Sequence, residues 1–413
     1  MGFSRVLKLR PPVSAVAALT AQVMLALGGF TIQALASREL GPSGLGSFAL
    51  LYGAIIMATA LSTGLIGDSL TVLNRNDDRI RRGLFCLGLA VTFGLAAIGM
   101  FISSWVVSTS TAVIFGLALA SYVGADLLRR MVMTQLRFWS LVLADFIGLI
   151  AMVIFLGICL LYFSVSIDHF LIALIISQTT AMAIALARLP QQERRLAKVS
   201  GWGNVGAVFR YGVWRGMQQF VRPTMLNVAR SLVLVAAGAA AVGQMEAGRI
   251  FVAPAMLLVQ GMGSYLFSTY AKRREQGPAL LGMADRVAIT TVIGSVLVAA
   301  VAVPALPIIG DLITGGHFEL SRIVVLGWAC YAASCATVLP YGSLAAVQGR
   351  QQRVFLLRVA DSLLSLGLVA VLVVGVGIDT SWTPWLLSVG SFAGGVLCRQ
   401  WLLRPASKVP VTV

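Results

Sequence analysis

The chain of 413 residues is 58% hydrophobic and only 11% charged, with a formal net charge of +16. A soluble domain carries about 25% charged residues, so most of this surface cannot face water. The basic residues form short clusters between apolar runs, which membrane topology explains better than nucleic-acid binding does. The composition therefore indicates an all-α membrane protein and argues against a soluble enzyme or a nucleic-acid-binding domain.

Apolar runs of about 20 residues, the span of a bilayer core, recur along the whole chain. We expect twelve membrane helices, at 13–37, 47–72, 83–107, 111–134, 138–163, 169–187, 208–236, 246–270, 285–310, 320–347, 354–377 and 383–403. Arg5, Lys8 and Arg10 precede the first run, but this run is too long for the apolar part of a signal peptide, about 7–15 residues. We therefore interpret it as the first membrane helix.

The loops between these segments alternate in charge. Of the 31 basic residues, 25 fall on one side of the expected topology, and three, Arg38, Arg249 and Arg322, fall on the other. Loops rich in Lys and Arg stay in the cytoplasm, so both termini are expected there. The alternation also favours an even number of helices, since a missed helix would scramble it.

A duplication is indicated by a segment that begins at Leu40 and aligns without gaps to a segment 197 residues later. The matched positions are Gly41 with Gly238, Gly46 with Gly243, Gly64 with Gly261, and, at larger offsets, Gln135 with Gln348 and Asp145 with Asp361. This order predicts two halves, residues 1–200 and 201–413. With six helices each, both halves have the same orientation, as parallel lobes around a central cavity.

Three stretches carry a family resemblance: LASRELGPSGLGSFAL, LRRMVMTQLRFWSLVLADFI and AAAVGQMEAGRIFVAPAMLLVQGMGSYLFSTYAKR. They resemble the polysaccharide transporter (Wzx-like flippase) branch of the MATE/MOP superfamily. The resemblance implies movement of an undecaprenyl-diphosphate-linked oligosaccharide from the cytoplasmic to the outer leaflet of a bacterial inner membrane. It also implies an anionic lipid-linked glycan and membrane lipid as partners, with a glycan polymerase or glycosyltransferases as further candidates.

Arg215, Arg222 and Arg230 fall inside the seventh expected helix, seven and eight residues apart. On a helix they lie within about 80° of one another and climb about 22 Å, so they form one stripe. Three arginines facing lipid would cost on the order of 8–10 kcal/mol. The stripe must therefore face protein or water.

Two interpretations of this stripe stay open. It could line a cationic cavity that binds diphosphate, because guanidinium groups grip phosphate with two hydrogen bonds. Gln218, Gln219 and Asn227 on the same helix would then offer donors for sugar hydroxyls. Alternatively, the arginines could pair with buried acids of neighbouring helices, namely Asp68, Asp145 or Asp361.

The same three acids lie deepest in apolar sequence and are candidates for coupling to protons or cations, since intramembrane carboxylates are costly unless used. A structural role that Asp145 and Asp361 share in the two halves is the alternative. Asp126 lies at helical spacing from Arg129 and Arg130, as Arg358 does from Asp361, so local ion pairs or an inner gate are expected. Arg38 either caps a helix or guides headgroups at the outer mouth.

No P-loop, metal-ligand cluster or catalytic constellation occurs, so we expect no cofactor and no enzymatic activity. The five cysteines lie in apolar runs without a CxxC pair and are interpreted as packing residues. Two alternatives to a flippase remain: a MATE-type cation-coupled exporter and a non-transporting membrane scaffold of a glycan synthase. A cation exporter needs acids in its cavity, whereas the seventh helix carries three arginines and no acid.

Overall fold

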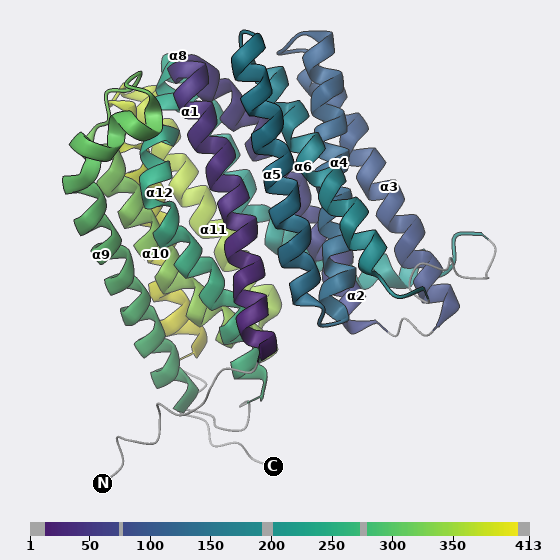
Figure 1. The fold of residues 1–413 in the computed structure, drawn as a ribbon. Coiled ribbons are helices and arrows are strands. Elements are labelled where there is room, and N and C mark those ends of the chain that lie inside the picture. Colours follow the sequence, from purple (N-terminus) through teal and green to yellow (C-terminus); the bar gives the residue numbers. More distant parts are fainter. Residues whose placement is uncertain (1–12, 74–76, 192–200, 273–278, 404–413) are drawn as a thin grey trace. The chain divides into compact units, whose positions relative to one another are not determined.

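The computed structural model describes residues 13–73, 77–191, 201–272 and 279–403, which are almost entirely helical and contain no strand (Figure 1). The helices are α1 (Val13–Ser62), α2 (Asp68–Val72), α3 (Asp78–Ser103), α4 (Thr109–Thr134), α5 (Phe138–Tyr162), α6 (Ile167–Arg188), α8 (Val205–Lys272), α9 (Ala279–Thr314), α10 (Arg322–Val347), α11 (Gln351–Val369) and α12 (Thr383–Leu397). π-Helical turns follow α1, α11 and α12, at Thr63–Gly67, Ala370–Gly375 and Cys398–Leu403. Both termini, and with them the expected cytoplasmic Arg5, Lys8 and Arg10, lie outside the described residues.

The expected number of membrane segments agrees with the helices. Within the described ranges, ten helices are long and apolar enough to cross a membrane, and two of them, Val16–Leu70 and Val205–Val259, have 55 residues each. At 1.5 Å per residue these two are about 80 Å long, more than twice a hydrocarbon core of about 30 Å. Each is divided by one kink, so the ten helices supply twelve segments, and the predicted fold class is confirmed.

The kinks are at Gly41 and Gly238, which have φ/ψ of 65°/−177° and 81°/177°. Only glycine adopts this region readily, because a Cβ atom would clash with the backbone. The two glycines are the pair that the 197-residue alignment matches. The separate loops expected at 38–46 and 237–245 are absent: the chain is helical on both sides of each glycine, so this part of the prediction was wrong.

Beyond the kinks, the two related segments touch through glycine. A Cβ atom added at Gly46 would overlap the carbonyl oxygen of Ala239, and one added at Gly243 would overlap the carbonyl oxygen of Pro42. Pro42 and Ala239 are themselves 197 residues apart, as Gly46 and Gly243 are. The contact is therefore reciprocal, which supports the duplication.

The chain forms two compact units. Unit 1 contains Met1–Gly29, Ser62–Ser164 and Asp168–Gly216, and unit 2 contains Phe30–Leu61, Val165–Ile167 and Met217–Val413. Helices α1 and α8 each contribute to both units. The division into two halves at residue 200 stays a prediction.

Helix α10 forms the centre of unit 2 and packs against α9 and α12. Its Trp328 is fully buried, and the indole Nε1 donates a hydrogen bond of 2.8 Å to the carbonyl of Met245. By contrast, α3 in unit 1 exposes large apolar side chains such as Phe93 and Phe101. An apolar exposed face is what a helix surrounded by lipid requires.

Candidate functional site

The three arginines of the expected stripe lie on α8 but have three different environments. Arg215 belongs to unit 1, whereas Arg222 and Arg230 belong to unit 2. Their partners decide which of them can bind a ligand.

Arg215 is paired with Asp68, as the acid-pairing alternative expects. Its Nε donates to Oδ2 of Asp68 over 2.9 Å, and both side chains are partly buried. The α8 backbone approaches closely here, since a Cβ atom at Gly64 would lie 2.5 Å from the carbonyl oxygen of Arg215. This arginine and this acid neutralise each other.

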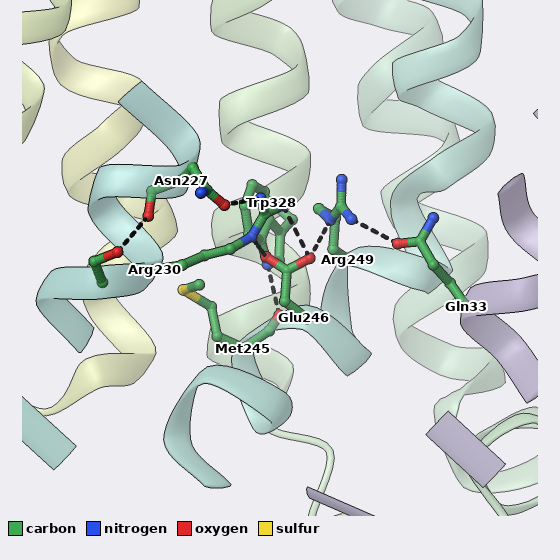
Figure 2. A network of polar contacts seen from close by, with 8 residues as sticks. Gln33, Asn227, Arg230, Met245, Glu246, Arg249 and Trp328 are labelled. Atoms are coloured by element: carbon green, nitrogen blue, oxygen red, sulfur yellow. Dashed lines mark hydrogen bonds and ion pairs between the residues drawn. The ribbon is translucent and has the colours of Figure 1, made fainter. Parts of the chain in front are cut away.

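Arg230 also has an acid partner, but one that the sequence did not suggest. Its Nε lies 2.9 Å from Oε1 of Glu246, whose other oxygen is 2.7 Å from Nε of Arg249. Arg249 in turn donates to Oε1 of Gln33 over 2.6 Å. We call Gln33, Arg230, Glu246 and Arg249 the Glu246 network. Figure 2 shows Arg230 and Arg249 directed toward the Glu246 carboxylate, and Gln33 directed toward Arg249.

The Glu246 network is deeply buried, with the Arg230 and Glu246 side chains only 6% and 3% exposed. Asn227 accepts a hydrogen bond of 3.3 Å from Arg230, and the Arg249 guanidinium lies 5.9 Å from the centre of the Trp328 ring. Arg249 was expected on the external side of the membrane, which stays a prediction; it lies on α8 in unit 2. Its spacing of three residues from Glu246 was the signal that could have revealed the pair.

Arg222 differs from the other two because none of the carboxylates that the structure describes lies within ion-pair distance of it. Its Nη2 donates a long hydrogen bond of 3.4 Å to Ser391 of α12, and its guanidinium lies 5.6 Å from the Tyr331 ring of α10. Arg358 and Asp361 of α11 lie within electrostatic reach. We call Arg222, Arg358 and Asp361, with Tyr331 and Ser391, the Arg222 cluster.

The ion pair expected between Arg358 and Asp361 is not formed. Oδ1 of Asp361 accepts a hydrogen bond of 3.1 Å from its neighbour Ser362, and the ion pairs of the described residues do not include one between Arg358 and Asp361. The buried Nε of Arg358 has no hydrogen-bond partner. The Arg222 cluster thus combines two guanidinium groups with one carboxylate that binds neither of them directly.

In unit 1, the remaining predicted acids are held by arginine. Asp145 forms a two-point ion pair with Arg129, whose Nη2 also donates to the carbonyl of Ala21 over 3.2 Å. Asp126 pairs with Arg130 at 3.2 Å. Arg129 therefore binds Asp145 rather than Asp126, which corrects that half of the expected local pairing.

Two other predicted polar groups bind backbone carbonyls. Arg38 donates to the carbonyl of Leu312 in the last turn of α9 over 3.3 Å, which is the capping alternative. Gln218 donates to the carbonyl of Gln351 over 3.3 Å, while Gln219 is half-buried on the same helix. Among the described residues, no group of three His, Cys, Asp or Glu side chains could hold a metal ion.

No protein-family model matches the chain, and no curated protein sequence does either. Solved structures do match. An inward-facing multidrug resistance MATE family transporter of the MOP superfamily has a TM-score of 0.72 at 12% identity, over 95% of this chain and 98% of the other. An outward-facing MATE structure gives 0.63 at 11% identity, over 95% and 94%. A MOP superfamily transporter from Pyrococcus furiosus, described as having a binding pocket of reverse polarity, gives 0.61 at 13% identity over 95% and 94%.

The chain has the fold of the MATE transporters. The coverage of about the whole length on both sides confirms the predicted fold class, MOP/MATE-like and all-α. At 11 to 13% identity the likeness concerns the fold alone. The narrower polysaccharide branch and the substrate belong to the proposal that follows.

Proposed function

We propose that this protein is a flippase that moves a polyprenyl-diphosphate-linked oligosaccharide from the cytoplasmic to the outer leaflet by alternating access, for cell-surface polysaccharide biosynthesis. The MATE fold supports the transport part of the proposal. The charge inside unit 2 supports an anionic cargo. The proposed location is a bacterial inner membrane with both termini in the cytoplasm.

The observation that carries the proposal is Arg222, a cation on a membrane helix whose contacts among the described residues are Ser391 and the Tyr331 ring, with no carboxylate at ion-pair distance. Together, the Arg222 cluster and the Glu246 network contain four arginines and two carboxylates, a surplus of two positive charges. An unpaired arginine at the bilayer centre costs at least ~2.5–3.5 kcal/mol. A diphosphate would remove this penalty, since phosphate oxygens accept two hydrogen bonds from each guanidinium group.

The membrane potential would assist this direction of transport. An inside-negative potential drives negative charge outward and contributes about 2.3 kcal/mol per charge per 100 mV. Asp68 and Asp145, two of the candidate coupling acids, are bound by arginines, so Asp361 is the carboxylate best suited to coupling with a proton or cation. The polyprenyl tail would stay in the lipid while the charged head passes through the protein.

The second candidate is a MATE-type cation-coupled exporter, which the multidrug transporters among the similar structures favour. A site for organic cations needs surplus carboxylates, whereas the polar clusters of unit 2 hold surplus arginines. The Pyrococcus furiosus transporter with a pocket of reverse polarity is a precedent for such a change within the fold. We therefore favour the anionic cargo.

A flipping assay with purified protein in liposomes tests the proposal. A fluorescent polyprenyl-diphosphate oligosaccharide should become accessible to an impermeant quencher on the opposite face, and Arg222→Ala should slow this at least tenfold. Arg222→Lys should retain part of the rate because the charge stays while the two-point geometry is lost. Wild-type liposomes that never expose the lipid would instead favour a scaffold that assists glycosyltransferases or a polymerase.

A further inference from the structure

Asp145 and Asp361, which the internal alignment matches, have different partners. Asp145 on α5 and Asp361 on α11 are 216 residues apart and are matched by the internal alignment. Asp145 is neutralised by the two-point contact with Arg129 of α4. Among the described residues Asp361 forms no such pair; its Oδ1 accepts a hydrogen bond from Ser362 instead.

The arginine that pairs with Asp145 has no counterpart at the matching position of α10. The offset of 213 residues that relates Gln135 to Gln348 places Gly342 at the position of Arg129. A Cβ atom at Gly342 would lie 3.4 Å from Nη2 of Arg358, so the space left by the missing side chain is bordered by this second arginine. Arg358 therefore approaches from α11 itself, at a spacing of three residues from Asp361.

Arg222 adds the other positive charge from α8. Its hydrogen bond reaches Ser391 on α12, and a Cβ atom at Gly394, three residues further on, would lie 2.5 Å from Oδ2 of Asp361. The Arg222 guanidinium and the Asp361 carboxylate thus lie against neighbouring turns of α12. Because Nε of Arg358 is buried without a partner, the cluster contains hydrogen-bonding capacity that the folded chain leaves unused.

We propose that Arg222 and Arg358 form a diphosphate-binding site in unit 2, with Asp361 as a built-in acid that weakens binding by competing electrostatically for both guanidinium groups. The Ser391 hydroxyl is placed to donate to a phosphate oxygen beside Arg222. A diphosphate carries enough negative charge to neutralise both arginines at once, which the single carboxylate does not. The identification of a lipid-linked diphosphate as the natural ligand rests on the proposed function; the anion site itself does not.

Isothermal titration of the purified full-length protein in a nonionic detergent tests the site. The probes are inorganic pyrophosphate and farnesyl diphosphate, which share the diphosphate and differ in the lipid. We expect Arg358→Gln and Arg222→Gln each to weaken binding at least tenfold, and Asp361→Asn to strengthen it several-fold. Tighter binding of farnesyl diphosphate assigns the site to a lipid headgroup, and tighter binding of pyrophosphate assigns it to a soluble anion.

The matched control is Arg399→Gln. Arg399 is also an arginine of unit 2, but its Nε and Nη2 each donate to Asp285 over 2.8 Å, so its loss should leave the affinity unchanged. Arg358→Lys keeps the positive charge and should bind the probes more tightly than Arg358→Gln. This difference distinguishes the loss of charge from a folding defect. Failure of the wild type to bind either probe, unchanged affinity in Arg358→Gln, or weaker binding in Asp361→Asn would overturn the proposal.

The flipping assay separates this inference from the proposed function. Probe binding that depends on Arg358, in a protein that flips no lipid, would leave the anion site standing and remove the transport proposal. Normal flipping by Arg358→Gln would leave the transport proposal standing and remove the anion site.

Discussion

At the scale of single residues, several charges on the described membrane helices are matched by a partner of opposite sign. Arg215 with Asp68, Arg129 with Asp145, and Arg230 with Glu246 are each joined by an ion pair. Such pairs satisfy hydrogen-bonding groups that lipid cannot satisfy. Arg222 departs from this pattern, which is why the functional proposal is built on it.

Replacing Glu246 by Gln should destabilise the protein. Arg230 and Arg249 would both lose their counter-charge in a buried site, and breaking a buried ion pair typically costs about 3–5 kcal/mol. The free energy of unfolding in mixed detergent micelles measures this loss. Glu39→Gln is the control. Glu39 forms an ion pair of 3.7 Å with Arg38, whose side chain is 52% exposed, so this change should cost under about 1 kcal/mol. Equal losses in the two variants would mean that the Glu246 network does not stabilise the fold.

Residue spacing could predict that Arg222 faces protein, but not that Arg215 and Arg230 are neutralised. Asp68 was among the acids considered for Arg215, because it lies in an apolar segment. Glu246 lies near the expected start of the next helix and looked like an end residue. Its burial depends on the kink at Gly238, which turns the second part of α8 back toward Arg230. A tertiary contact of this kind leaves no periodic trace in the sequence.

At the scale of elements, the kinked helices α1 and α8 depend on glycine. The apolar runs predicted where helices form, and the alignment predicted that Gly41 and Gly238 are equivalent. The lack of a loop at each kink was not predictable from hydropathy, because a single residue in a region open to glycine turns the chain. The reciprocal contact of Gly46 and Gly243 likewise became visible only in three dimensions.

Gly243→Ala should therefore lower stability, although alanine is normally the better helix former. Its methyl group would overlap the carbonyl oxygen of Pro42 and push the two segments apart, and such overpacking costs about 1–3 kcal/mol. Thermal unfolding in detergent measures the effect. Gly282→Ala on α9 is the matched control, since a Cβ atom there meets nothing within 4 Å, and it should be neutral or slightly stabilising. A Gly243→Ala protein as stable as this control would contradict the close contact.

At the scale of the whole molecule, composition and loop charge sufficed to predict a helical membrane protein with twelve segments, and the fold agrees. The orientation in the membrane, the cytoplasmic termini and the cavity between two lobes stay predictions. The fold does not define the cargo either, since the similar structures include multidrug transporters and one transporter with a pocket of reverse polarity. The sign of the charge that moves with the cargo separates these cases.

The most direct test of the account is the current that accompanies transport. Proteoliposomes on a solid-supported membrane would be exposed, on their cytoplasmic face, to a polyprenyl-diphosphate oligosaccharide. We predict a transient current of negative charge in the direction of transport, reduced at least tenfold in Arg222→Ala. A current of positive charge moving with the cargo, or one that Arg222→Ala leaves intact, would contradict an anionic cargo bound by the unpaired arginines of unit 2.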